Sequence, residues 1–174
     1  VTGIDGKVWD LNGPHLEEME LLDRDGDLLV TAITHEKHTC VAVADSIHTD
    51  YPCEIKIARK EDKILHRVCF ITRKDESCVV EKWVSVQTGQ DYNETAARAL
   101  EQVREKRANG YRKMMGEHKA VWEKLWKHSE VLIEGDDAAM EATNYSLYHL
   151  HCIAPRHTQS LSIPARGLSG QTYK

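Results

Sequence analysis

The chain has 174 residues, of which 41% are hydrophobic and 29% charged, as is ordinary for a soluble globular protein. Its net charge of −5 argues against a nucleic-acid partner. Apolar runs such as Asp27–Ile33 are far shorter than the roughly 20 residues that span a bilayer, so no membrane partner is expected. The length suits one domain, or one domain and part of a second.

Residues 1–90 are expected to be the C-terminal part of a β-sandwich domain. They contain short segments rich in β-branched and aromatic residues, separated by turn residues. Because no helical pattern comes between these segments, they predict antiparallel pairing. In the last segment Val84 and Val86 alternate with Trp83 and Ser85, which places the two pairs on opposite faces. The predicted strands are Leu28–Thr34, Thr39–Ala44, Cys53–Ala58, Ile64–Thr72 and Cys78–Thr88.

Residues 91–129 are expected to form a helical linker. The segment Asp91–Glu94 fits a capping box, in which the Asp91 side chain caps the first helical turn. A break is predicted at Asn109-Gly110. Beyond it, an apolar stripe with helical spacing predicts a helix that packs against a large neighbouring surface. The stripe consists of Met114, His118, Val121, Trp122, Leu125 and Trp126.

Residues 130–174 contain a short extended piece, a further helix and a loop. Asp136 is a good N-cap for a helix that runs from Asp137 to about Cys152. One face of this helix is expected to carry Ala139, Thr143, Leu147 and Leu150. From Pro155 onward the prolines and glycines predict an ordered loop.

Several motifs are better explained by ordinary structure than by chemistry. His35 and His38 are three residues apart in a strand-and-turn region, whereas a metalloprotease motif needs histidines four apart on a helix. The segment Asp23–Asp27 lacks the spacing of a calcium loop and predicts a β-turn. The basic cluster Arg104–Lys113 is expected to be a solvated helix face and not a phosphate-binding patch.

The cysteines are odd in number, and no two have the C-x-x-C spacing. A disulfide framework or a structural zinc site is therefore not expected, and a reducing cytoplasm is the simplest compartment. The five are Cys40, Cys53, Cys69, Cys78 and Cys152.

The last fifty residues resemble glycoside hydrolase family 65. The segment Trp122–Asp136 is similar to the linker and barrel entry of that family, and Ile163–Lys174 is similar to a segment that leads to its substrate site. Upstream, Leu11–Leu16 resembles the family's N-terminal sandwich domain. Asn144-Tyr145 stands where many relatives carry Arg-Phe, and Pro164–Gln171 is closer to the kojibiose and nigerose type than to the maltose and trehalose type.

The resemblance implies an α+β architecture: an antiparallel sandwich (1–90), a helical linker (91–129) and the start of an (α/α)6 catalytic barrel (130–174). It implies an inverting phosphorylase that uses inorganic phosphate to cleave an α-glucosyl disaccharide into β-glucose 1-phosphate and a sugar. No cofactor or metal is expected, and the full-length protein is expected to be a cytoplasmic homodimer.

Catalytic residues are expected beyond Lys174, so the chain alone is predicted to be inactive. By the same resemblance, Arg166, Tyr173 and Lys174 are candidates for substrate binding at the rim of the sugar site. Two alternatives stay open. One is a hydrolase of the same family, such as a trehalase or an α-glucosidase, and the other is a non-catalytic carbohydrate-binding sandwich module.

Overall fold

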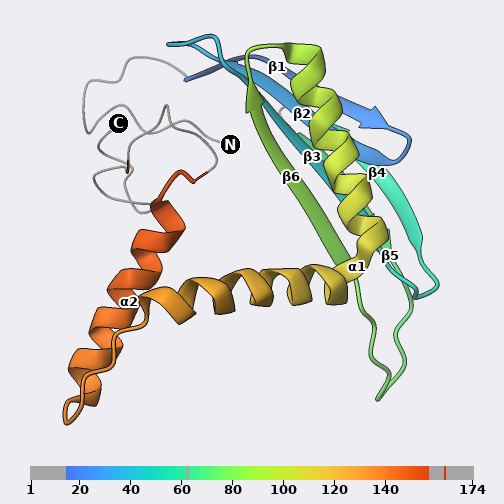
Figure 1. Ribbon diagram of the computed structural model, residues 1–174. Coiled ribbons are helices and arrows are strands. Elements are labelled where there is room, and N and C mark those ends of the chain that lie inside the picture. The colour runs from blue at the N-terminus through green and yellow to red at the C-terminus, as the bar shows by residue number, and fades with distance from the viewer. Residues whose placement is uncertain (1–14, 62, 157–162, 164–174) are drawn as a thin grey trace. The chain divides into compact units, whose positions relative to one another are not determined.

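The computed structural model describes residues 15–61, 63–156 and 163 of the chain. Within them, strands precede two helices, so the predicted α+β class is confirmed (Figure 1). The strands are β1 (Leu16–Arg24), β2 (Asp27–Thr34), β3 (Cys40–His48), β4 (Glu54–Lys60), β5 (Lys63–Cys69) and β6 (Glu81–Gly89). The helices are α1 (Tyr92–Ser129) and α2 (Asp137–Ile153).

The main sheet has the strand order β1-β2-β3-β6, and every neighbouring pair is antiparallel. The predicted turn at Asp23–Asp27 connects β1 to β2. Asp25 and Gly26 both have positive φ there (58° and 86°), and the Gly26 amide donates a hydrogen bond to the Asp23 carboxylate at 3.0 Å. The segment is therefore a hairpin turn, as predicted.

Strand β1 was not predicted from the sequence. Its residues Leu16–Arg24 include three glutamates and do not alternate cleanly between apolar and polar side chains. The pairing with β2 also shifts register between Glu17 and Glu20, and Glu18 has a φ of 49°. A bulge of this kind interrupts the period of two by which a strand is recognised in a sequence.

A second sheet, made of β4 and β5, packs on the main sheet. Arg59 of β4 donates a hydrogen bond to the Leu21 carbonyl of β1 at 3.0 Å. The ring nitrogens of His66 in β5 bond to the Gly26 carbonyl (2.8 Å) and to the Asp45 carboxylate of β3 (3.0 Å). Asp45 lies on the opposite face of β3 from the buried Ala44, so this sheet adds the second layer of a sandwich.

The first half of α1 covers the other face of the main sheet (Figure 1). The helix begins where predicted, because the Asp91 carboxylate accepts a hydrogen bond from the Glu94 amide at 2.8 Å. Gly89 is needed just before it, since a Cβ there would lie 2.4 Å from the Thr95 hydroxyl oxygen. The core between helix and sheet contains Leu29, Ala42, Ala44, Trp83, Ala96, Ala99 and Val103.

The predicted break in α1 is confirmed at Gly110, whose φ of 75° and ψ of 160° are not helical. The described residues divide into two compact units, with the boundary between Met114 and Met115. The second unit contains the rest of α1 and α2. As predicted, Asp136 caps α2, accepting a hydrogen bond from the Ala139 amide at 2.9 Å.

On the face of α2 that carries Ala139, Thr143, Leu147 and Leu150, the first three are half-buried and Leu150 is 51% exposed. His151, which is four residues beyond Leu147, is also half-buried. In the part of the chain that the structure describes, neither helix combines the length and apolar character needed to cross a membrane.

Candidate functional site

The residues predicted to bind substrate, Arg166, Tyr173 and Lys174, lie outside the described residues, as does most of the predicted loop after Pro155. The structure therefore does not test them. The described residues contain two other clusters with organised polar or aromatic side chains: a buried ion-pair network in the first unit and an aromatic cluster in the second.

The ion-pair network is centred on Asp27, which is 2% exposed at the start of β2. Its two carboxylate oxygens accept hydrogen bonds from Arg104 and Arg107 of α1, each at 2.7 Å. Arg107 also donates to the Ser46 hydroxyl of β3, and Arg104 to the Arg24 carbonyl at 2.7 Å. The network joins α1 to three strands of the main sheet.

The electrostatics of this network hold Asp27 in its ionised form. Burial acts to raise its pKa, but hydrogen bonds from Ser46 and Arg104, together with the charges of Arg107 and Arg104, outweigh burial. The pKa of Asp27 therefore lies below its ordinary value. A carboxylate held in this way suits a structural ion pair and is a poor proton donor.

Part of the basic cluster Arg104–Lys113 was therefore misassigned as a solvated face, since Arg104 and Arg107 bind a buried carboxylate. The sequence contained a signal for this pair. Asp27 opens an otherwise apolar run, and two arginines three residues apart on a helix can reach one partner. What the sequence did not show was that these segments, about 80 residues apart, pack together.

A pocket of about 450 Å³ lies beside the network, where the β3–β4 connection approaches the first half of α1. It is lined by His48, Thr49, Asp50, Val79, Glu81, Arg107, Ala108 and Gly110. The guanidinium of Arg107 is bound to Asp27, and His48 lies 3.3 Å from the exposed Asp50 carboxylate. Arg107 and His48 thus each have a carboxylate partner already, and we assign no catalytic group to this pocket.

The aromatic cluster lies between the second half of α1 and α2. Trp122 stacks on Tyr148 of α2, with ring centroids 5.1 Å apart and an interplanar angle of 28°. His151 of α2 contacts the edges of both Trp122 and Trp126 at about 6 Å, and it hydrogen-bonds to the Ser129 hydroxyl at 2.8 Å. These contacts pack the two helices together and confirm that Trp122 and Trp126 belong to a packed helix face.

Another side of the second half of α1 lines a groove of about 730 Å³, which we call the groove face. The groove face is lined by Met115, His118, Lys119, Trp122, Glu123, Trp126, Lys127 and Glu130. The apolar stripe predicted from Met114 to Trp126 is therefore only partly covered. Val121, which was assigned to this stripe, is 59% exposed.

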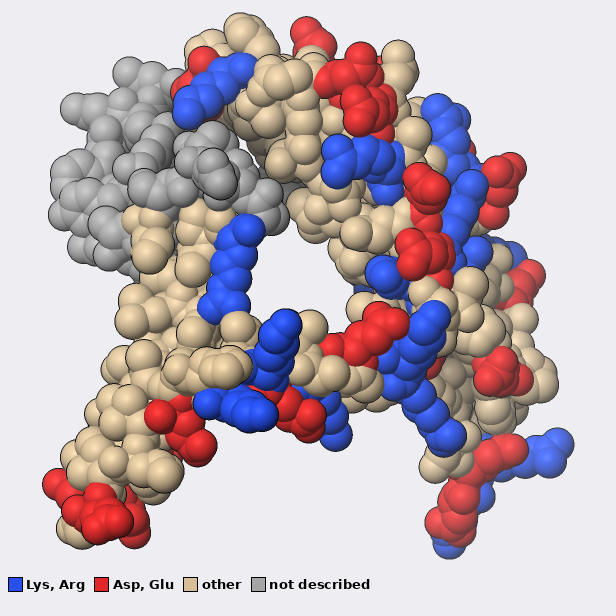
Figure 2. Space-filling model, viewed as in Figure 1, with Lys and Arg blue, Asp and Glu red and all other residues tan. Residues whose placement is uncertain are grey.

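Elsewhere among the described residues, charged side chains form local ion pairs. His35 pairs with Glu17, and His15 pairs with Glu36 at 2.5 Å, across the β1–β2 hairpin. No group of three or more potential metal ligands occurs among residues 15–61, 63–156 and 163. On the face shown in Figure 2, acidic side chains gather at the N-terminal end of α2, where Glu134, Asp136 and Asp137 are exposed.

Comparison with known families gives the class of protein. Its sequence matches the family model of the N-terminal domain of glycosyl hydrolase family 65 over residues 1–125, and the described part of this range forms antiparallel sheets followed by a helical segment. The chain belongs to this family, which confirms the resemblance seen in its sequence.

Three phosphorylases are similar to the chain over 99% of its length. Nigerose phosphorylase of Lachnoclostridium phytofermentans is 40% identical, and the match covers 26% of that protein. Kojibiose phosphorylase of Halothermothrix orenii is 28% identical over 24% of its length, and 1,2-alpha-glucosylglycerol phosphorylase of Bacillus selenitireducens is 27% identical over 22%. The chain thus spans about a quarter of the length of the relatives it matches.

Proposed function

We propose that the full-length protein is an inverting phosphorylase that cleaves an α-glucosyl disaccharide with inorganic phosphate. The observation that carries the proposal is the 40% identity to a nigerose phosphorylase across 99% of the chain. The kojibiose and glucosylglycerol enzymes support the reaction type, because they carry the name phosphorylase although their substrates differ. Nigerose is accordingly the first substrate to test.

In the proposed reaction, a carboxylic acid protonates the glycosidic oxygen as its bond to the anomeric carbon breaks. An oxygen of phosphate forms the new bond to that carbon from the opposite face, which gives β-glucose 1-phosphate and a free sugar. We assign no catalytic role to the side chains that the structure describes. The chain is expected to contribute substrate-binding residues only through Arg166, Tyr173 and Lys174, and to have no turnover alone.

The assignment to the cytoplasm and the homodimeric state remain part of the proposal. Support for a reducing compartment comes from the five cysteines, all of which carry free thiols. The dimer rests on the family resemblance, and size-exclusion chromatography of the full-length protein tests it.

The decisive experiment incubates the full-length protein with nigerose, kojibiose, maltose and trehalose, each with and without phosphate. Glucose 1-phosphate and free glucose are measured separately. Phosphate-dependent release of glucose 1-phosphate from nigerose is the expected result. Equal release of free glucose with and without phosphate would assign the protein to the hydrolases of the family. A protein that binds sugars and releases neither product would be a carbohydrate-binding module.

A further inference from the structure

The side chain of His66 connects the β4–β5 sheet to the main sheet from a nearly buried position. The side chain is only 5% exposed. Its Nε2 atom lies 2.8 Å from the Gly26 carbonyl oxygen in the β1–β2 turn, and its Nδ1 atom lies 3.0 Å from the Asp45 carboxylate of β3. The two ring nitrogens therefore face two hydrogen-bond acceptors on different parts of the main sheet.

Two acceptors require two donors from the ring. A neutral imidazole has one N–H group and one lone pair, so it can satisfy one of these contacts but turns a lone pair toward the other oxygen. A carbonyl oxygen carries no proton, and an aspartate is a carboxylate near neutral pH. The second oxygen of Asp45 already accepts a hydrogen bond from the Lys82 ammonium at 2.7 Å. The imidazolium form of His66, with a proton on each nitrogen, fits both contacts at once.

We propose that His66 is a pH-dependent latch, which holds the β4–β5 sheet against the main sheet while both of its ring nitrogens carry a proton. Histidine changes its charge within the physiological pH range. When the ring gives its Nδ1 proton to solvent, a lone pair faces the Asp45 carboxylate, so that attractive contact becomes repulsive. The latch then keeps only the hydrogen bond to the Gly26 carbonyl.

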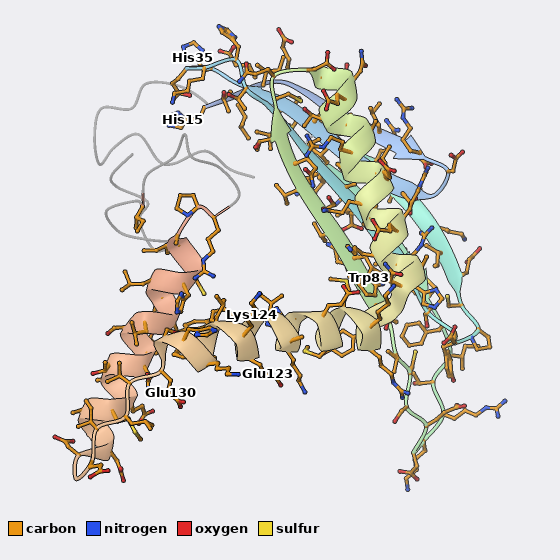
Figure 3. All side chains as sticks on the ribbon, in the orientation of Figure 1. His15, His35, Trp83, Glu123, Lys124 and Glu130 are labelled. Carbon is orange, nitrogen blue, oxygen red and sulfur yellow. The ribbon has the colours of Figure 1, made fainter. Side chains whose placement is uncertain are left out.

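Asp45 and Lys82 lie on the face of the main sheet that the β4–β5 sheet covers. Trp83 of β6 packs beside α1 on the opposite face (Figure 3), so the side chain of its neighbour Lys82 projects toward this one. Lys82 is 63% exposed, whereas Asp45 is 18% exposed. His66 therefore completes a chain of three charged side chains that crosses β6, β3 and β5.

The cations near His66 act against a further positive charge. Arg59 lies two residues from Ile57, which is opposite His66 in the register, so Arg59 and His66 share one face of the β4–β5 sheet. The Arg59 guanidinium donates to the Leu21 carbonyl. Because Arg59 and Lys82 both disfavour a charged ring, the two acceptors must supply the stabilisation of the imidazolium.

The remaining charged groups of the surrounding elements are directed elsewhere. In the β1–β2 turn, the Asp23 carboxylate accepts the Gly26 amide, and Asp25 and Asp27 pair with Arg104. The other charged residues of β4 and β5 alternate onto the face opposite His66. They are Glu54, Lys56, Lys60, Lys63 and Arg67.

Little apolar burial holds the β4–β5 sheet in place. Of the residues of β4 and β5, Ile64 alone is buried, and Ile55 and Leu65 are 44% and 41% exposed. A two-stranded sheet is only marginally stable by itself. Polar contacts with the main sheet therefore matter for its attachment, and losing one of them should increase local opening.

The test measures amide hydrogen exchange of β4 and β5 in the full-length protein at about pH 5.5 and about pH 8.5, with rates corrected for the intrinsic effect of pH. His66→Gln keeps an N–H donor but carries no charge. At the lower pH this substitution should speed exchange in both strands about tenfold, and at the higher pH about twofold at most. An effect of the same size at both pH values would overturn the proposal.

His48→Gln is the matched control. His48 also lies beside an aspartate, 3.3 Å from the Asp50 carboxylate, but its side chain is 48% exposed. This substitution should leave the exchange of β4 and β5 unchanged at both pH values. An effect equal to that of His66→Gln would indicate general loosening of the domain and would contradict the latch.

A second measurement uses the wild-type protein, so it decides the question even if His66→Gln does not fold. The exchange rate of a histidine C2 proton rises with pH while the ring is charged and becomes constant once the ring is neutral. Peptide mass spectrometry of the full-length protein should show this plateau at a higher pH for His66 than for His48. A plateau at the same or a lower pH would overturn the proposal. Neither measurement depends on turnover, so a failed phosphorylase assay would leave both intact.

Discussion

The side-chain amide of Asn144 pairs with both backbone groups of Val131. Its oxygen accepts a hydrogen bond from the Val131 amide, and its nitrogen donates one to the Val131 carbonyl, each at 3.1 Å. These two hydrogen bonds hold the residues that connect α1 to α2 against α2.

Replacing Asn144 with alanine should therefore loosen this connection. The loss of two hydrogen bonds, partly offset by the better helix propensity of alanine, is expected to destabilise the segment by about 1–2 kcal/mol. The measurement is hydrogen exchange of the Val131 amide, which should become faster. Ser146→Ala on the same helix is the control, because the Ser146 hydroxyl donates its hydrogen bond within α2, to the Ala142 carbonyl. Similar exchange in both variants would contradict the role of Asn144.

Asp27→Asn should be among the most destabilising substitutions in the sandwich unit. It leaves Arg104 and Arg107 facing each other without the carboxylate, at an expected cost of about 3 kcal/mol in the free energy of unfolding. Urea unfolding followed by tryptophan fluorescence measures this cost. Asp25→Asn is a matched control, because Asp25 lies 3.6 Å from Arg104 but is 94% exposed, and its effect should be within error.

The same carboxylate predicts how stability depends on pH. The folded-state pKa of Asp27 is below its ordinary value of 3.8, so the folded protein binds this proton less readily than the unfolded chain does. The stabilisation is therefore complete above the ordinary value and is lost as the pH falls through the folded-state value. The difference in unfolding free energy between wild type and Asp27→Asn should be constant from neutral pH to about pH 5 and shrink in stronger acid. A difference that does not change in acid would refute the ionised state.

Two glycines of α1 should respond in opposite directions to alanine. Gly110 has a φ of 75° and a ψ of 160°, which an L-residue adopts only with strain, so Gly110→Ala should destabilise the protein by about 1–3 kcal/mol. Gly116 has helical geometry and open space around its Cα, so Gly116→Ala should stabilise it by up to about 1 kcal/mol. Thermal unfolding of the two variants measures both effects. A stabilising Gly110→Ala would mean that the break is not required.

Local interactions could be predicted from the sequence because each depends on a few neighbouring residues. Asp91 and Asp136 were identified as helix caps, Gly110 as a break and Asp25-Gly26 as a turn, and the structure confirms all four. Strand β1 was not predicted, because a bulge interrupts its alternation of apolar and polar side chains. The family was recognised from the segments around Trp122 and Ile163.

What only the tertiary structure decided was which surfaces meet. Alternation in β6 separated Val84 and Val86 from Trp83 and Ser85, but it did not reveal that the valines are exposed and Trp83 and Ser85 are buried. Alternation defines two faces, whereas burial depends on which face α1 covers. The pairing of β3 with β6 and the partners of Asp27 likewise join segments far apart in the sequence. Such contacts depend on how the elements pack, which no local pattern encodes.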